Sequence, residues 1–165
     1  MGIGCLEVGQ EVGMSIEYTP IIDVQDIKAY FKKVVNKCVH LFEFGVHSSR
    51  FDMVRVDTWN QKIKGFEFKV SKQDFRNDKK WPKYLQYCHS LTFVCPFGLI
   101  TKEELPKHIG ILYIQKWHWP ERRDLWFYKS TWARKPRNQN LDKDTYIEVI
   151  SLLLNRTKWR WGDFF

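Results

Sequence analysis

The sequence predicts a single α/β domain in which a mixed central sheet is flanked by helices. The chain has 165 residues, the length of one ordinary domain. Hydrophobic residues make up 44% and aromatic residues 16%, enough to build one core. Helical and strand-like periodicities alternate along the chain, without an internal repeat or a linker rich in Gly or Ser. The expected order is helix, three strands, helix, three strands, helix.

The expected boundaries are an N-terminal arm at 1–20, the domain at 21–157 and an aromatic, basic tail at 158–165. The first helix begins after Asp23, a suitable N-cap, and Asp26 places negative charge in its first turn. Its buried stripe consists of apolar residues at helical spacing: Ile27, Tyr30, Phe31, Val34, Val35 and Cys38.

Strand patterns follow the first helix at 41–46, 51–56 and 63–70, where β-branched and aromatic residues dominate. Polar turn residues separate the three segments. The next segment, 72–89, has a helical composition. Pro82 lies inside it and is expected to open a second helix, because proline suits the first turn of a helix and not its interior.

The second half of the chain is expected to add three strands and a last helix. The expected elements are a strand at 91–95 closed by Pro96, a one-turn helix start at 101–104, strands at 109–115 and 125–129, a basic loop at 134–138 and a helix at 141–155. The buried side of this helix is expected to hold Tyr146, Ile147, Ile150, Leu153 and Leu154.

The charge balance favours a polyanionic partner. Lys and Arg total 27 against 19 Asp and Glu, a formal net charge of +8. Basic side chains that neutralise phosphates release counterions, which favours nucleic acid binding. Net charge by itself does not determine function, so a merely soluble basic protein stays the alternative.

The sequence also indicates the compartment. The N-terminus lacks a secretory signal, and no apolar run is long enough to span a bilayer. We therefore expect a soluble, cytoplasmic protein without a membrane partner. The four cysteines do not have the paired spacing of a zinc site, and we expect them to be reduced and mostly buried.

The candidate chemistry lies in the third predicted strand. Successive side chains of a strand point to opposite faces, so Glu67 and Lys69 share one face while Phe66, Phe68 and Val70 share the other. A carboxylate and an ammonium group are thereby placed side by side over a layer of aromatic rings. Alone, a Glu-x-Lys pair is also typical of a solvated strand face.

A second carboxylate comes from the preceding strand. If the turn centres on residues 59–60, Asp52 opposes Glu67; if it centres on 60–61, Asp52 opposes Lys69. Both registers leave Asp52 on the same face, with opposed Cβ atoms about 4.5–5.5 Å apart. A shift of one residue would send Asp52 to the other face.

Two neighbouring carboxylates predict a site for Mg²⁺ or Mn²⁺, because these ions take one or two carboxylates and complete their shell with water and phosphate oxygens. The backbone carbonyl of Phe68 is a candidate third ligand. Such a metal polarises a phosphate and activates a water. Lys69 is expected to stabilise charge in the transition state, since an ammonium near its usual pKa of about 10.4 is a poor base at pH 7.

These residues carry a family resemblance. The motifs are Arg50-x-Asp52, Glu67-x-Lys69 and Asp74-Phe75-x-x-Asp78-x-Lys80-Trp81-Pro82-x-Tyr84-x-x-Tyr87-Cys88. Together they closely resemble the MmcB-like DNA-repair family of the PD-(D/E)XK nuclease-like superfamily, over residues 23–156. The resemblance implies a restriction-endonuclease-like core.

The resemblance also implies roles for individual residues. Asp52 and Glu67 are the implied metal ligands, and Lys69 is the implied catalytic lysine. Glu43 matches an acidic position that supports the site. Arg50 has two alternatives, a contact to phosphate or an ion pair with Glu43.

Other residues of the motif favour structural roles. Asp74 is expected to cap a helix, Asp78 to pair with a lysine and Trp81 to pack on the sheet. For nucleic acid contact the candidates are Arg122, Arg123, Trp132, Arg134, Lys135 and Arg137, with Trp132 stacking on an unpaired base. The alternative for this set is a solvated basic surface.

The expected function is a Mg²⁺-dependent, endonuclease-like DNA repair protein that hydrolyses phosphodiester bonds. A second hypothesis is a catalytically silent DNA-binding or recruitment module in a repair complex. A third is a phage or mobile-element resolvase that acts on branched DNA. DNA is the expected partner, while RNA as a substrate, a homodimer and a partner from a repair complex stay open.

Overall fold

The computed structural model describes residues 17–19, 21–34, 39–119 and 125–161, with side chains omitted at 17–19, 119, 125 and 157–161. Seven strands form one mixed sheet. The strands are β1 (Glu17–Thr19), β2 (Val39–Val46), β3 (Ser49–Asp57), β4 (Lys62–Phe68), β5 (Ser90–Pro96), β6 (Gly110–Trp119) and β7 (Leu125–Arg134). The helices are α1 (Val24–Val34), α2 (Lys72–Asn77), α3 (Lys143–Trp161) and the short 3-10 helices η1 (Trp81–Tyr87) and η2 (Lys102–Glu104).

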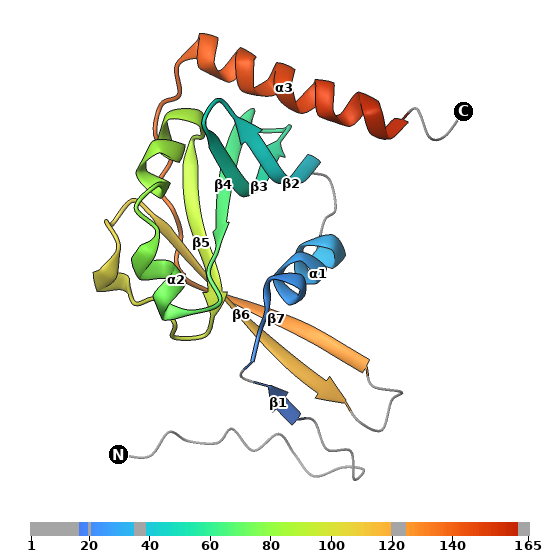
Figure 1. The fold of residues 1–165 in the computed structure, drawn as a ribbon, viewed down its shortest axis with the longest axis vertical. Helices are drawn as coiled ribbons and strands as arrows, with labels where there is room; N and C mark the ends of the chain where they lie inside the picture. Colours follow the sequence, from blue (N-terminus) through green and yellow to red (C-terminus); the bar gives the residue numbers. More distant parts are fainter. Residues whose placement is uncertain (1–16, 20, 35–38, 120–124, 162–165) are drawn as a thin grey trace.

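The strand order is β1-β6-β5-β4-β3-β2, and β7 pairs with β6. Strands β4, β5 and β6 are parallel, while β2, β3 and β4 form an antiparallel meander and β6 and β7 an antiparallel hairpin (Figure 1). The expected α/β class and mixed sheet are confirmed. Strand β1 falls within the expected arm at 1–20 and was not predicted; it pairs with the far end of β6.

The register between β3 and β4 decides between the two sequence alternatives. The pairs run from Met53 with Phe66 to Asp57 with Lys62. This register centres the turn on residues 59–60, which brings Asp52 opposite Glu67. The alternative with Lys69 opposite Asp52 is excluded.

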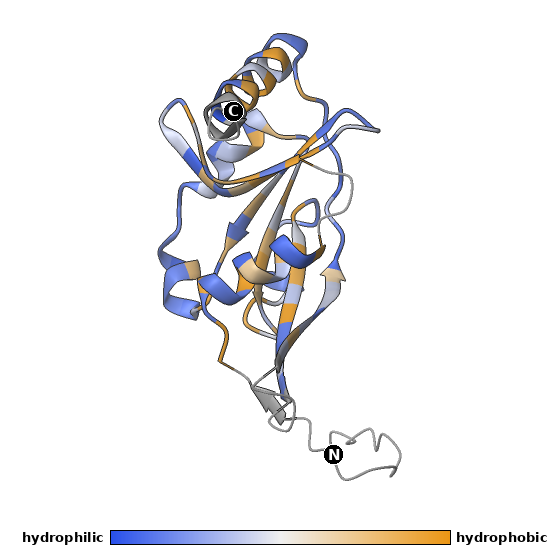
Figure 2. Ribbon diagram, turned by 90° about the vertical axis from the view of Figure 1, so that its right-hand side faces the viewer, coloured by the Kyte–Doolittle hydropathy of each residue, from blue (hydrophilic) through white to orange (hydrophobic). Residues whose placement is uncertain are grey.

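The sheet has a hydrophobic core on each face. On one face α1 contributes Ile27 and Phe31, which pack with Phe66 and Phe68 of β4. The other face is covered by η1 and α3, which contribute Tyr84, Val149 and Leu153. Figure 2 shows the hydrophobic residues concentrated in the central strands.

The helices follow the sequence prediction in most respects. The Asp26 amide donates to the Asp23 carboxylate at 2.8 Å, which confirms the predicted N-cap of α1. The helical segment after β4 divides into α2 and η1, and Pro82 lies in the first turn of η1 as expected. Val34 is 50% exposed, so its predicted place in the buried stripe is wrong, and residues 35–38 of the predicted first helix lie outside the described residues.

Helix α3 differs from the expectation in its buried face and its end. Leu153 is buried, but Ile147 and Leu154 are 50% and 57% exposed, so the predicted burial of these two is wrong. Val149 is fully buried instead. The helix packs mainly on η1 and β2, and Ile147 and Leu154 lie outside this contact. The helix also continues through the expected tail boundary at 157/158.

None of the helices in the described residues is both long and apolar enough to cross a membrane. Cys88 and Cys95 are buried thiols, as expected. The other two cysteines, Cys5 and Cys38, lie outside the described residues.

Candidate active site

The candidate site lies at the carboxyl end of β4. The rings of Phe66 and Phe68 pack against Phe31 of α1, with centroids 5.3 and 5.8 Å apart. Because side chains alternate along a strand, Glu67 and Lys69 lie on the opposite face. The predicted division of this strand into an aromatic face and a charged face is confirmed.

Two hydrogen bonds join the segment around Asp52 on β3 to the end of β4 at Glu67 and Phe68. The Phe68 amide donates to Oδ2 of Asp52 at 2.7 Å, and the Asp52 amide donates to Oε1 of Glu67 at 3.4 Å. Each carboxylate therefore contacts the backbone of the other strand. These bonds continue the β3–β4 contact beyond the last backbone pair, Met53 with Phe66.

This closeness changes the ionisation of both acids. Burial and the charge of Asp52 raise the pKa of Glu67 to about 9. Burial also raises the pKa of Asp52, although the bond from the Phe68 amide opposes the shift. Glu67 is only 3% exposed. At neutral pH the pair therefore holds a proton unless a cation compensates its charge.

Lys69 forms an ion pair with Asp78, an acid of the segment that follows α2. Its ammonium lies 2.8 Å from Asp78, 3.9 Å from Asp74 and 4.0 Å from Glu67. The predicted pairing of Asp78 with a lysine is thus observed, and the lysine is Lys69 of the candidate site. Burial alone would lower the pKa of Lys69, but the hydrogen bond and charge of Asp78 outweigh it and raise the pKa.

The chain turns back after β4, and this turn places Asp74 and Asp78 beside Lys69 at the end of the strand. Ser71 precedes helix α2, and its hydroxyl accepts a hydrogen bond from the amide of Asp74 at 3.1 Å. The N-cap is therefore Ser71, and the expectation that Asp74 caps the helix is wrong. This cap leaves the Asp74 carboxylate available to approach Lys69. Trp81 packs on Phe93 of the sheet with centroids 5.9 Å apart, as expected.

Glu43 lies on β2 beside the candidate site. It has a left-handed backbone with φ of +53°, unusual for a non-glycine residue within a strand. The pairs Phe42 with Met53 and Phe44 with Phe51 bracket it, so Glu43 lies opposite Asp52. Its negative charge contributes to the raised pKa of Asp52. Backbone strain of this kind often accompanies functional sites.

The carboxylate of Glu43 forms ion pairs with two basic side chains. Lys28 of α1 lies 3.0 Å from it, and Nε of Arg50 lies 3.5 Å from it. Of the two alternatives for Arg50, the ion pair is observed. The Arg50 side chain is 73% exposed, so it also faces solvent beside the site.

The donor set fits a hard divalent cation. Across the described ranges, no three side chains of His, Cys, Asp or Glu gather as metal ligands. The site instead offers the paired carboxylates of Asp52 and Glu67, and Mg²⁺ typically takes one or two carboxylates with water. The Phe68 amide points to Asp52, and the carbonyl of a strand residue points to the same side as its amide. The Phe68 carbonyl therefore faces Asp52.

Comparison with known proteins places the chain in a family. The family model of the DNA repair protein MmcB-like matches residues 24–126, more than half of the chain and the whole of the candidate site. The chain belongs to the MmcB-like family. The predicted membership of the MmcB-like family is thereby confirmed over residues 24–126. No curated protein matches the chain.

A solved structure shares the fold of this MmcB-like protein. It is a protein of unknown function from Silicibacter pomeroyi, with a TM-score of 0.62 and 21% sequence identity. The match covers 84% of this chain and 85% of the other. At this identity the likeness concerns the fold alone.

The predicted nucleic acid contacts of the MmcB-like protein divide into three groups. Arg122 and Arg123 lie outside the described residues. Arg134 donates four hydrogen bonds to backbone carbonyls, those of Lys102, Leu105, Pro106 and Ile109. Four of the five guanidinium donors can be used in this way, which favours a structural role for Arg134. Trp132, Lys135 and Arg137 are exposed and stay candidates.

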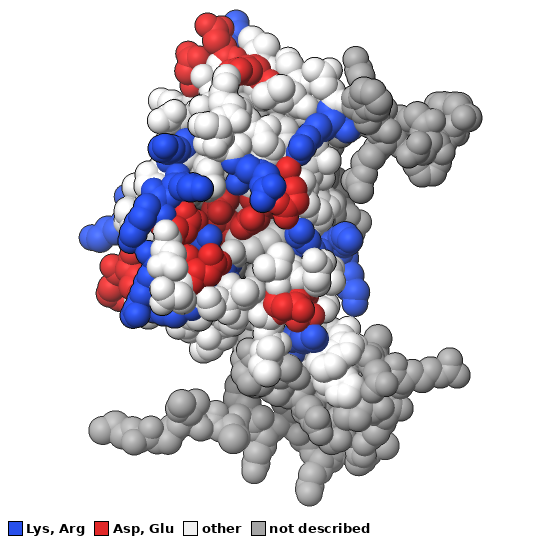
Figure 3. Space-filling model, viewed as in Figure 1, with Lys and Arg blue, Asp and Glu red and all other residues white. Residues whose placement is uncertain are grey.

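The surface around the site mixes both charges. Figure 3 shows acidic side chains near the middle of this face, over β4 and α2, with Lys and Arg beside them. An acidic centre with a basic border fits a bound cation together with a polyanion, since each charge then faces its opposite.

Proposed function

We propose that this MmcB-like protein is a metal-dependent DNA endonuclease that hydrolyses phosphodiester bonds during repair. The carrying observation is the meeting of Asp52 and Glu67, a buried pair of acids, beside the fixed ammonium of Lys69. The family model supports DNA repair as the setting. We also infer a restriction-endonuclease-like core and membership of the PD-(D/E)XK superfamily, because the acid-x-lysine strand and its partner aspartate match that arrangement.

Asp52, Glu67 and the carbonyl of Phe68 would hold Mg²⁺ or Mn²⁺. When bound, such a cation polarises the phosphate and lowers the pKa of a bound water. Glu67 has to lose its proton to become a metal ligand. Because its pKa is raised to about 9 in the metal-free protein, this deprotonation lowers the affinity for the metal at neutral pH.

Lys69 acts as a fixed positive charge. Asp78 holds its ammonium at 2.8 Å and keeps its pKa high, so the amine does not serve as a base at neutral pH. A positioned ammonium stabilises the negative charge that develops on phosphate oxygens in the transition state. Asp78 is a positioning residue in this scheme, because it acts through Lys69.

One observation favours the second hypothesis, a catalytically silent DNA-binding or recruitment module. Glu67 and Lys69 are only 3% and 6% exposed, and Lys69 is already neutralised by Asp78. Asp52 and Asp74 beside them are more exposed than Glu67 and Lys69. A module of this kind would bind DNA and leave it uncut.

Cleavage of plasmid and branched DNA with Mg²⁺ or Mn²⁺ tests the proposal. We expect Lys69→Ala and Glu67→Gln to slow cleavage about 100-fold or more, the typical loss of a group that stabilises transition-state charge. Lys64→Ala is the matched control, because Lys64 lies on the opposite face of β4 and pairs with Asp57. Wild-type protein that binds DNA without cutting it would establish the recruitment module.

Asp78→Asn tests whether Asp78 acts by positioning Lys69. We expect it to slow cleavage about 10-fold and to lower the pH at which activity declines on the alkaline side, because Lys69 loses the acid that raises its pKa. Asp74→Asn, which removes a more distant and more exposed acid, should change both quantities less. An unchanged alkaline limb in Asp78→Asn would remove the positioning role.

A further inference from the structure

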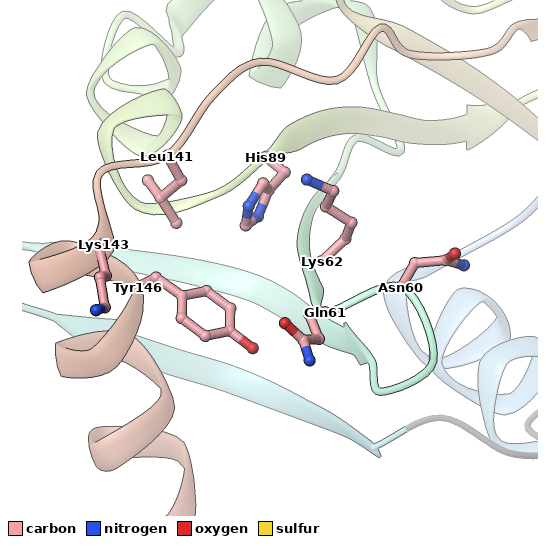
Figure 4. Close-up of a pocket in the computed structure, with 7 residues that line it drawn as sticks. All are labelled: Asn60, Gln61, Lys62, His89, Leu141, Lys143 and Tyr146. Carbon is pink, nitrogen blue, oxygen red and sulfur yellow. The ribbon is translucent and has the colours of Figure 1, made fainter.

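A small pocket lies at the other end of β4 from the candidate active site. Its volume is about 260 Å³. It is lined by the β3–β4 turn, the segment before β5 and the start of α3, and its residues are Asn60, Gln61, Lys62, His89, Leu141, Lys143 and Tyr146. Figure 4 shows Gln61, His89 and Tyr146 turned toward a common space. With a rise of about 3.3 Å per residue, Lys62 lies roughly 16 Å along β4 from Glu67.

The hydrogen bonds of His89 present a donor to this pocket. Its Nδ1 accepts the Ile63 amide at 3.0 Å, and its own amide donates to the Ile63 carbonyl at 2.8 Å. A neutral ring that accepts at Nδ1 carries its hydrogen on Nε2. Burial and the charge of Lys62 lower the pKa of His89, so the ring is neutral at pH 7.

The Nε2 donor has no partner within the part of the chain that the structure describes. His89 is only 6% exposed, and its ring is held edge-on to Tyr146 with centroids 5.9 Å apart. The ring is thus held in place at the wall of the pocket, and Nε2 can donate to an acceptor that enters the pocket from outside.

The positive charge of the lining favours an anion as this acceptor. Lys62 and Lys143 line the pocket, and neither forms an ion pair with a described residue. Nearby acids are engaged elsewhere, since Asp57 pairs with Lys64 and Asp142 accepts the amides that begin α3. At about 260 Å³ the pocket lies below the range of about 300–1,000 Å³ typical of small-molecule sites, which suits a single phosphate group.

Trp59 indicates what carries the phosphate. It lies at the tip of the β3–β4 turn, one residue before the pocket lining, and is 93% exposed. An exposed indole offers a stacking platform for an unpaired base, and such platforms next to cationic grooves are typical of single-strand binding. Paired bases in a duplex leave no face free for this contact.

We propose that this pocket binds a backbone phosphate of single-stranded nucleic acid while Trp59 stacks on a neighbouring base. The choice of nucleic acid as the polyanion rests on the proposed function. The pocket would hold a strand at a distance from the Asp52–Glu67 pair, so the protein would contact an unpaired strand at two points along β4.

Binding of a fluorescently labelled oligothymidylate to the full chain, measured by anisotropy in EDTA, tests the phosphate contact. We expect Lys62→Gln with Lys143→Gln to weaken binding about 10-fold at low salt. The slope of log K against log salt should fall by at least about 0.7, the increment for one phosphate on a single strand. Lys32→Gln, an exposed lysine on α1, is the control and should change neither quantity appreciably.

The stacking contact is tested by Trp59→Ala and Trp59→Phe. Loss of one stacked base costs about 1–3 kcal/mol, so Trp59→Ala should weaken binding at least 5-fold. Trp59→Phe keeps an aromatic face and should retain most of the affinity. Equal affinity of all variants, or a preference for duplex that Trp59→Ala leaves unchanged, would overturn the proposal.

The assay separates this inference from the proposed function. EDTA prevents metal-dependent cleavage, so single-strand binding that depends on Lys62 and Trp59 supports the pocket even if no cleavage is ever found. In the reverse case, DNA cleavage that depends on Lys69 with unaltered binding by the pocket variants would support the nuclease and overturn the pocket.

Discussion

The carboxyl group of Glu67 has the most strongly shifted pKa of the candidate site. Its neighbours come from three directions: Asp52 from β3, Lys69 from its own strand and Asp78 from beyond α2. Two of them are acids, and burial adds to their effect. The result is a carboxyl group with a pKa of about 9, which is protonated in the metal-free protein at neutral pH.

This ionisation predicts how stability depends on pH. The folded-state pKa of Glu67 exceeds the usual value of 4.5, so its contribution is fully present below about pH 4.5 and declines as pH rises toward 9. Relative to Glu67→Gln, metal-free wild type should lose up to about 4 kcal/mol of unfolding free energy between pH 6 and pH 9, at about 1.36 kcal/mol per pH unit. Denaturant titrations in EDTA measure this difference.

Mg²⁺ should reverse part of that loss. Because the ion competes with the proton of Glu67, the increase in melting temperature that Mg²⁺ produces should grow from pH 6 to pH 9. Glu67→Gln should show little increase at any pH. Parallel pH profiles for the two proteins would contradict the assignment of the raised pKa to Glu67.

Strand β4 combines packing and chemistry at the scale of one element. Phe66 and Phe68 pack with α1 on one face, and Glu67 lies on the other face beside Lys69, which follows the strand. Gly65 of the same strand lies close to the ring of Phe51 from β3. A Cβ at this position would meet Cε1 of Phe51 at 2.6 Å.

The close approach makes Gly65 a sensitive position. Gly65→Ala should destabilise the protein by about 1–3 kcal/mol, the usual cost of extra volume in a packed core. Gly45→Ala on β2 is the matched control, because its nearest heavy atom lies 3.9 Å away. Chemical denaturation compares the two variants, and equal stability would show that Phe51 moves aside freely.

Across the whole molecule, α1 joins distant parts of the chain. The Asp26 carboxylate accepts the Tyr128 hydroxyl at 2.9 Å and pairs with Lys116 at 2.8 Å, so the first helix is fastened to the β6–β7 hairpin. The same helix packs on Phe66 and Phe68. It thereby connects the hairpin to the strand that carries the site (Figure 1).

Asp26→Asn tests this connection. Removing one charge from a largely buried pair should cost about 2–3 kcal/mol. Burial opposes but does not cancel the effect of Lys116, which lowers the pKa of Asp26, so its stabilisation is present above about pH 3.8 and lost as pH falls through the lowered value. The difference between variant and wild type, measured by thermal unfolding, should therefore shrink in acid.

Glu148→Gln serves as the control for Asp26→Asn. Glu148 pairs with His47 at 2.9 Å, and both side chains are about half exposed. Surface pairs contribute about 0–1 kcal/mol. Similar losses in the two variants would mean that the α1 connection is no stronger than a surface contact.

The sequence by itself determined the element order and the two faces of β4. Both follow from local chemistry: periodicity separates helices from strands, and alternation places Glu67 and Lys69 opposite Phe66 and Phe68. Its motifs were also long enough to indicate the family. The exceptions were β1, which is too short to show a period, and the buried face of α3, which depends on what the helix packs against.

Only the tertiary structure decided how the site is assembled. The alternation of side chains along β3 and β4 is compatible with two registers. The observed backbone pairs correspond to the register with Asp52 opposite Glu67. The partner of Asp78 could not be inferred, because any of several lysines satisfies a surface ion pair. The pKa of Glu67 and the pocket at His89 likewise depend on groups far apart in the chain, whose distances arise only when the sheet and helices pack.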